Sequence, residues 1–212
     1  MSVPIILAVA AVVVVAVVLG VVANRQKDPR RRSAALVKTG AALMAVFTVF
    51  GGAFIGGYAM VEPGGTPGVL MILAWAAPML ILAALAWFWP AGTAPLLLAL
   101  TAAFVAICVW FALDPTTARS FQNANGPVLA VGVVALAFPA AVLGLKRTGL
   151  AGWLLLALGA LPLLITIIGR SGPAVSLAAA SVVPLITGAV YLMAARMARG
   201  SSTPDTVRAA AA

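Results

Sequence analysis

Seven runs of roughly twenty apolar residues occupy most of this chain, and they constrain its fold more than any other feature. A helix needs about 20 mostly apolar residues to cross the hydrocarbon core of a bilayer. Of the 212 residues, 64% are hydrophobic and only 8% are charged, so lipid must be the solvent for most of the surface. The sequence therefore predicts an all-α integral membrane protein, a bundle of seven transmembrane helices at residues 3–24, 40–61, 68–89, 94–113, 127–145, 149–168 and 173–195.

Basic residues sort to one side of the predicted membrane, as they do in cytoplasmic loops. With the N-terminus outside, Arg119 and Arg170 lie on the outer side together with the carboxylates Glu62 and Asp114. We therefore predict an N-out, C-in, multi-pass protein of a bacterial plasma membrane. Eleven of the 13 basic residues then lie inside: Arg25, Lys27, Arg30, Arg31, Arg32, Lys38, Lys146, Arg147, Arg196, Arg199 and Arg208.

The segments between and after the apolar runs are short. We expect the basic link 25–38 to lie on the anionic inner leaflet and the polar stretch 114–126 to form an outer loop. The transmembrane domain is predicted to cover residues 1–199, and residues 200–212, which are small and polar, to form a disordered cytoplasmic tail.

The residue types that this sequence lacks narrow its chemistry. It has no histidine, which is the usual haem ligand, the commonest zinc ligand and the commonest general base, and it has one cysteine, Cys108, within an apolar run. It has no glycine-rich phosphate loop, and its basic residues cluster at helix ends, which argues against nucleic-acid binding. We expect no metal and no cofactor. We expect the partners to be the lipid bilayer, a hydrophobic small molecule and, in one alternative, further copies of the chain in an oligomer or another subunit of a membrane complex.

The second apolar run carries two different faces. Gly52 and Gly56 form a GxxxG pair, which favours close approach of a neighbouring helix. On the roughly opposite face, three aromatic side chains and a carboxylate recur every fourth residue, so they align along the helix. These residues are Phe50, Phe54, Tyr58 and Glu62.

The fourth run ends in a similar way, with Trp110 four residues before Asp114. In the N-out orientation Glu62 and Asp114 reach the same membrane face. A carboxylic acid at the edge of an apolar pocket has a raised pKa and can donate a proton, and aromatic faces stabilise a developing cation. We therefore predict Glu62 and Asp114 as catalytic acids, with Phe50, Phe54, Tyr58, Trp75 and Trp110 lining a substrate pocket. Each acid has a second interpretation, in which it ends its helix beside a proline and faces water.

In size, helix count and the acid at the end of its second helix, the chain resembles the small membrane-bound terpene cyclases of meroterpenoid and indole-terpenoid pathways. The resemblance implies protonation-initiated cyclisation of a prenylated substrate, with Glu62 as the acid that starts the reaction. The family has a second acid near its last helix, where this sequence has no Asp or Glu, so Asp114 would have to take that role.

Two other functions remain open. Pro67 and Pro78, eleven residues apart in the third run, match Pro173 and Pro184 in the seventh, which suggests a 3+1+3 internal repeat and a small-molecule transporter similar to the SWEET type. In SWEET transporters, mid-helix prolines occur in the first two helices of each half. Here Pro139 and Pro162 provide them in the second half only. The third function is that of a non-catalytic subunit. The mid-membrane polar groups are few, and such hydroxyls often bond their own backbone: Thr48, Thr101, Thr166, Ser176, Ser181 and Thr187.

Overall fold

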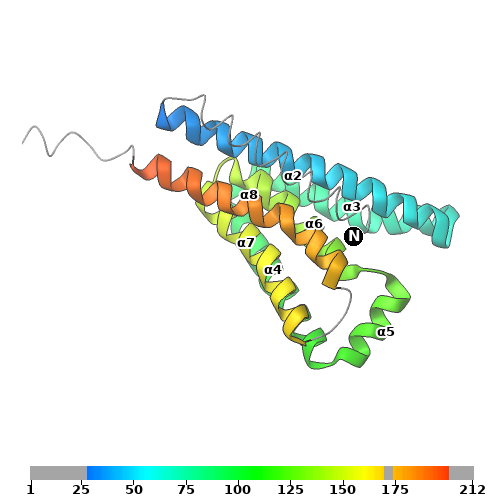
Figure 1. The fold of residues 1–212 in the computed structure, drawn as a ribbon. Helices are drawn as coiled ribbons and strands as arrows, with labels where there is room; N and C mark the ends of the chain where they lie inside the picture. Colours follow the sequence, from blue (N-terminus) through cyan, green and yellow to red (C-terminus); the bar gives the residue numbers. More distant parts are fainter. Residues whose placement is uncertain (1–27, 170–173, 201–212) are drawn as a thin grey trace, which may run out of the picture.

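The computed structural model describes residues 28–169 and 174–200, and the chain is helical almost throughout these ranges (Figure 1). Seven α-helices and one short π-helix follow one another along the described chain. They are α2 (Pro29–Ala59), η1 (Met60–Gly64), α3 (Gly65–Phe88), α4 (Pro90–Leu113), α5 (Pro115–Asn125), α6 (Val128–Gly144), α7 (Thr148–Gly169) and α8 (Ala174–Gly200).

Five of these helices, α2, α3, α4, α7 and α8, are long and apolar enough to cross a membrane. A sixth span is formed if α5 and α6, which bend by 77° at their junction, are counted as one. The prediction of an all-helical chain with several membrane-crossing helices is thus confirmed for the described residues. The predicted first span, 3–24, and the predicted tail beyond Gly200 lie outside them.

The polar stretch 114–126 forms a helix, contrary to the expectation of a loop. Asp114 precedes α5, Pro115 occupies its first turn, and Gly126 ends it with a φ of +76°, a conformation that favours glycine. The helix is amphipathic, with Ala118 and Gln122 buried beneath it. The helix has only about three turns and few buried residues. The polar residues of the segment therefore outweigh this weak amphipathic pattern in the sequence.

The basic link also differs from the expectation, because α2 begins at Pro29 rather than near residue 40. The Asp28 carboxylate accepts a hydrogen bond from the Arg30 N–H at 2.9 Å, and Pro29 stands at the first helical position. At about 1.5 Å per residue, the 31 residues of α2 extend about 46 Å, longer than the roughly 30 Å of a hydrocarbon core. The first turns of α2 therefore carry the basic residues beyond the apolar part of the helix.

Helix α6 lies at the centre of the bundle, where it contacts α2, α3, α4, α7 and α8. More than half of its 17 residues are buried, although α3, α4 and α7 are similarly apolar. Helices α7 and α8 pack against each other along their length, and α2 crosses α8, as Figure 1 shows.

Small residues bring α7 and α8 into backbone contact. A Cβ atom added at Gly188 would lie 2.9 Å from the carbonyl oxygen of Gly152, and one added at Gly159 would lie 3.0 Å from that of Ser181. Association of helices in lipid depends on this kind of close packing, because hydrocarbon provides no hydrophobic driving force between them.

The corresponding pair in the first half of the proposed repeat does not pack in this way. Helices α2 and α3 contact each other far less extensively than α7 and α8 do. The arrangement of the described helices therefore gives no support to a 3+1+3 repeat.

All described basic residues except Arg119 gather at one end of the bundle, here called the basic end, where α2 starts, α6 joins α7, and α8 finishes. The Ser33 hydroxyl donates to the Ala194 carbonyl at 2.9 Å, which joins the start of α2 to the last turns of α8. The Lys146 ammonium donates to the Trp87 carbonyl and lies 5.2 Å from the centre of the Trp87 ring. The basic end consists of Arg30, Arg31, Arg32, Lys38, Lys146, Arg147, Arg196 and Arg199.

Tyr191 joins three helices near this end. Its ring is fully buried against Gly40 of α2 and Gly144 of α6, where no side chain could be accommodated. Its hydroxyl donates to the Ala141 carbonyl at 2.9 Å. In a continuing α-helix the Leu145 N–H would donate to the Ala141 carbonyl, but here it donates to the Val142 carbonyl. The Tyr191 hydroxyl therefore supplies a hydrogen-bond donor for the Ala141 carbonyl near the end of α6.

Replacement of Tyr191 should therefore be among the most destabilising changes in the chain. We expect Tyr191→Phe to lower the free energy of unfolding by about 1 kcal/mol, because only the hydrogen bond is lost. Tyr191→Ala should lower it by about 3–5 kcal/mol, because a cavity also forms. Thermal unfolding in detergent measures both. Tyr58→Phe is the matched control, since Tyr58 is exposed, and an equal loss at both tyrosines would contradict this account.

Candidate functional site

The aromatic face of α2 points out of the bundle. Phe50, Phe54 and Tyr58 are 73%, 77% and 58% exposed, so they meet the surroundings of the protein and line no enclosed pocket among the described residues. In a bilayer such a face meets lipid, with Tyr58 near the end of α2 in the position typical of an interfacial ring.

The glycine face of α2 packs against α3, as its sequence pattern predicted. A Cβ at Gly52 would lie 3.1 Å from the Trp75 ring, and one at Gly56 would lie 3.7 Å from Ile72. Gly68 of α3 lies directly against the backbone of Ala59. Trp75 therefore fills the seam between α2 and α3, where its indole nitrogen has no hydrogen-bond partner among the described residues.

The two candidate acids lie at different turns of the chain. Glu62 belongs to η1, which links α2 to α3 through Gly64 and Gly65, two residues with positive φ values of 68° and 56°. Asp114 lies between α4 and α5. In Figure 1 the α2–α3 turn and helix α5 are at separate corners of the molecule.

Asp114 acts as the N-cap of α5. Its carboxylate accepts hydrogen bonds from the Thr116 hydroxyl at 2.6 Å and from the Thr117 N–H at 3.1 Å. These bonds, the Thr116 hydroxyl foremost, lower the pKa of Asp114 to about 2. A carboxyl group with such a pKa is ionised at neutral pH, which suits it to capping a helix and makes it a poor proton donor. Trp110, predicted to lie beside it, is 56% exposed, and its ring centre lies 5.6 Å from that of Phe111 in a tilted pair.

A groove lies between α4 and α7, and no residue of η1 lines it. It has a volume of about 500 Å³ and is open to the surroundings, where Leu98 and Trp153 are 55% and 64% exposed. Typical ligand pockets measure about 300–1,000 Å³. The groove, hereafter the α4–α7 groove, is lined by Leu98, Thr101, Ala102, Val105, Leu150, Trp153, Leu154, Ala157 and Leu161.

Thr101 is the one hydroxyl-bearing residue among those that line the groove. It is only 5% exposed, and its hydroxyl has no hydrogen-bond partner among the described residues. Other helical threonines of this chain behave differently. The hydroxyls of Thr39, Thr48, Thr93 and Thr148 each donate to the carbonyl four residues earlier, at 2.8–2.9 Å. The sequence singled out Thr101 as a mid-membrane polar group, but nothing in it indicated a groove.

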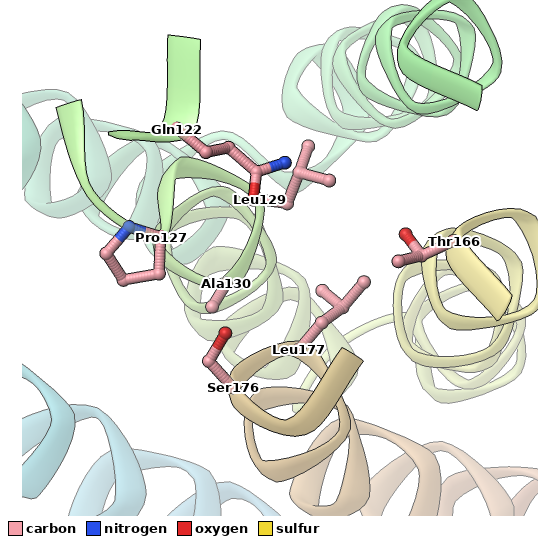
Figure 2. A pocket seen from close by; sticks show the side chains of 7 residues that line it. All are labelled: Gln122, Pro127, Leu129, Ala130, Thr166, Ser176 and Leu177. Atoms are coloured by element: carbon pink, nitrogen blue, oxygen red, sulfur yellow. The ribbon is translucent and has the colours of Figure 1, made fainter. Parts of the chain in front are cut away.

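A second, much smaller cavity lies where α5 crosses the ends of α6, α7 and α8 (Figure 2). Its volume is about 10 Å³, the space of one water molecule. Gln122, 7% exposed, and Thr166 line this space from α5 and α7. The Gln122 amide nitrogen has no hydrogen-bond partner among the described residues.

Comparison with known proteins yields no relative: no protein family, no curated protein and no solved structure matches this chain. Functional inference therefore depends on the geometry of the described residues.

The Asp114 cap predicts how α5 responds to acid. Because the pKa of Asp114 in the folded protein is depressed, its stabilisation of α5 is complete above the ordinary pKa of about 4. That stabilisation should be lost as the pH falls from there through about 2. Hydrogen exchange of the α5 amides, corrected for the intrinsic rate, measures the loss.

Two variants make this test specific. Asp114→Ala should expose the α5 amides at every pH, whereas Asp114→Asn keeps an acceptor at the N-cap and should remove the pH dependence while retaining much of the protection. Equal protection of the unmodified protein at pH 5 and pH 2.5 would contradict the capping role.

Proposed function

We propose that this chain is a membrane-embedded binding protein that takes a hydrophobic small molecule from the bilayer into the α4–α7 groove. The observation that supports this function best is the groove itself, about 500 Å³ in volume, nearly all apolar and open to the side. A ligand dissolved in the lipid can enter such a groove without crossing water. Trp153 at its rim, 64% exposed, offers a rigid apolar surface for contact with that ligand.

The cyclase prediction differs from this proposal in the chemistry it requires. Protonation of a prenyl chain needs an acid beside the substrate, and none of the residues that line the groove is acidic or ionisable. The two candidate acids belong to other turns, and Asp114 is engaged as a helix cap. Cyclisation by Glu62 stays a prediction, while the groove favours binding without catalysis.

The proposal includes the topology that the sequence predicts, with seven spans, the N-terminus outside and the plasma membrane as the location. Gathering of all described basic residues except Arg119 at one end of the bundle supports this orientation. Helix α5, with Arg119 and the Asp114 cap, would then lie at the outer surface.

Cysteine labelling tests this orientation. In a Cys108→Ser background, a cysteine at Ser120 on α5 should react with a membrane-impermeant maleimide added to intact cells. A cysteine at Ala34 near the start of α2 should react only after the membrane is permeabilised. Both positions are exposed, and the reverse pattern would invert the proposed topology.

Filling the groove should prevent ligand binding. We expect Ala157→Trp to reduce photo-crosslinking of an alkyl diazirine probe to groove residues by at least roughly tenfold, equivalent to about 1.4 kcal/mol. Protein in lipid nanodiscs, analysed by mass spectrometry, gives the labelled positions. Ala53→Trp is the control, because Ala53 is exposed on α2, away from the groove.

Two outcomes would contradict the proposed function. One is equal labelling of the groove in both variants. The other is a disulfide between cysteines placed at Val13 and Ala157, which would show that the N-terminal apolar segment of this same chain occupies the groove.

A further inference from the structure

The α4–α7 groove begins next to the basic end. Helices α4 and α7 both start there, because the ammonium of Lys146, two residues before α7, donates to the carbonyl of Trp87, three residues before α4. Leu150, the first residue of α7 that lines the groove, is only the third residue of that helix. A chain bound along the groove would therefore have one of its ends beside cations.

The groove is about as long as one leaflet of a bilayer is deep. Its lining on α7 runs from Leu150 to Leu161, eleven residues or about 16 Å along the helix at 1.5 Å per residue. The hydrocarbon core of a bilayer is about 30 Å thick, so this length corresponds to roughly half of it. All nine lining residues are uncharged. In length and composition the groove thus suits a single hydrocarbon chain that starts at one membrane surface and ends near the middle of the membrane.

Arg147 continues the groove face of α7 by one turn. It precedes Leu150 by three residues and Leu154 by seven, the spacing of one helix face. The Arg147 carbonyl accepts a helical hydrogen bond from the Ala151 N–H at 3.1 Å, so its backbone follows the course of the helix. Side chains on a helix lean toward its N-terminus, and Arg147 is exposed. Its guanidinium therefore extends from the apolar lining toward the membrane surface, where a lipid carries its headgroup.

A second guanidinium lies near the start of α7. A Cβ atom added at Gly149 would lie 3.4 Å from a guanidinium nitrogen of Arg199, which reaches there from the last turn of α8. Asp28 is the only acidic residue that the described chain has at this end of the bundle, and it caps α2 and lies 3.9 Å from Arg31. The start of the groove is therefore a region of positive charge, and guanidinium groups match the oxygens of a phosphate in geometry.

We propose, on the basis of the binding function above, that the ligand of the groove is an anionic phospholipid of the surrounding membrane. One acyl chain lies along the groove from Leu150 toward Leu161, and the headgroup phosphate binds Arg147 at the basic end, with Arg199 adding positive charge. Basic residues between membrane helices recognise anionic headgroups in this way. A neutral lipid would fill the same groove but would gain nothing from the two cations.

Two matched lipid probes test the proposal. Both carry the same diazirine-bearing acyl chain, one on phosphatidylglycerol, which is anionic, and one on phosphatidylcholine, which has no net charge. In nanodiscs we expect the anionic probe to crosslink to groove residues roughly three- to tenfold more than the other, as one charge-assisted hydrogen bond implies. Arg147→Gln should reduce this ratio to about one without reducing labelling by phosphatidylcholine, and Arg147→Lys should retain part of it. Lys38→Gln is the matched control, because Lys38 is an exposed cation of the basic end on α2, which does not line the groove.

The outcomes separate this proposal from the binding function. If both probes label the groove equally in the unmodified protein, the groove binds chains but the anionic headgroup is wrong. If neither probe labels the groove, the binding function itself fails. An equal loss of preference in Lys38→Gln and Arg147→Gln would show that the overall charge of the basic end attracts the lipid, which overturns the headgroup site at Arg147.

A competition experiment identifies the source of the phosphate. Glycerol 3-phosphate, which has the phosphate without an acyl chain, should leave labelling by the anionic probe unchanged at millimolar concentration. Displacement of the probe by glycerol 3-phosphate would show that the site recognises a free phosphate, and would overturn the assignment to a lipid.

Discussion

The close contact between α7 and α8 determines much of the rest of the bundle. In lipid, apolar side chains gain little by moving from the surface to the interior, so helices associate where their backbones can approach. Gly152, Gly159 and Gly188 provide that approach. The side of α7 that lines the groove carries Leu150, Trp153 and Leu161 instead, and no glycine of α7 is among the lining residues. The close α7–α8 contact and the open α4–α7 groove thus coincide with small and with bulky side chains of α7, respectively.

The central position of α6 follows from the same preference for small side chains at contacts. Its inward prolines and alanines include Pro139, which is fully buried, and the buried Pro162 and Pro184 lie on its neighbours α7 and α8. A proline leaves the carbonyl four residues earlier without its helical partner. Such carbonyls are tolerated in a membrane when neighbouring helices shield them from lipid, so burial of all three prolines agrees with a protein-lined interior.

Much of the fold could be predicted from the sequence, because the signals for it are local. Six of the seven predicted spans coincide with described helices to within a few residues at most ends, since each depends only on its own run of apolar residues. The start of α2 is the main exception: the basic residues Arg30 to Arg32 suggested a link, but the Asp28 cap and Pro29 begin a helix there. Helix α5 was missed because its burial depends on only a few residues, among them Ala118 and Gln122, in a polar segment.

The candidate site was harder to predict, for a physical reason. The spacing of Phe50, Phe54 and Tyr58 establishes that they share a helix face, but it does not establish what that face meets. In water an apolar face predicts a core, whereas in lipid an outward aromatic face is equally stable. The glycine face of α2 was predicted correctly, because Gly52 and Gly56 specify a close contact. The groove arises between α4 and α7, which are separated in sequence by more than thirty residues, so no local pattern could indicate it.

The distribution of ionisable groups helps to decide between catalysis and binding. All described cations except Arg119 gather at the basic end, and Asp114 begins α5. The residues that line the α4–α7 groove include no ionisable group. Proton transfer to a molecule in the groove would therefore need an acid or base from outside this lining, whereas apolar contact needs only the side chains that are already there. The composition of the lining thus favours the proposal of ligand binding over the proposal of catalysis.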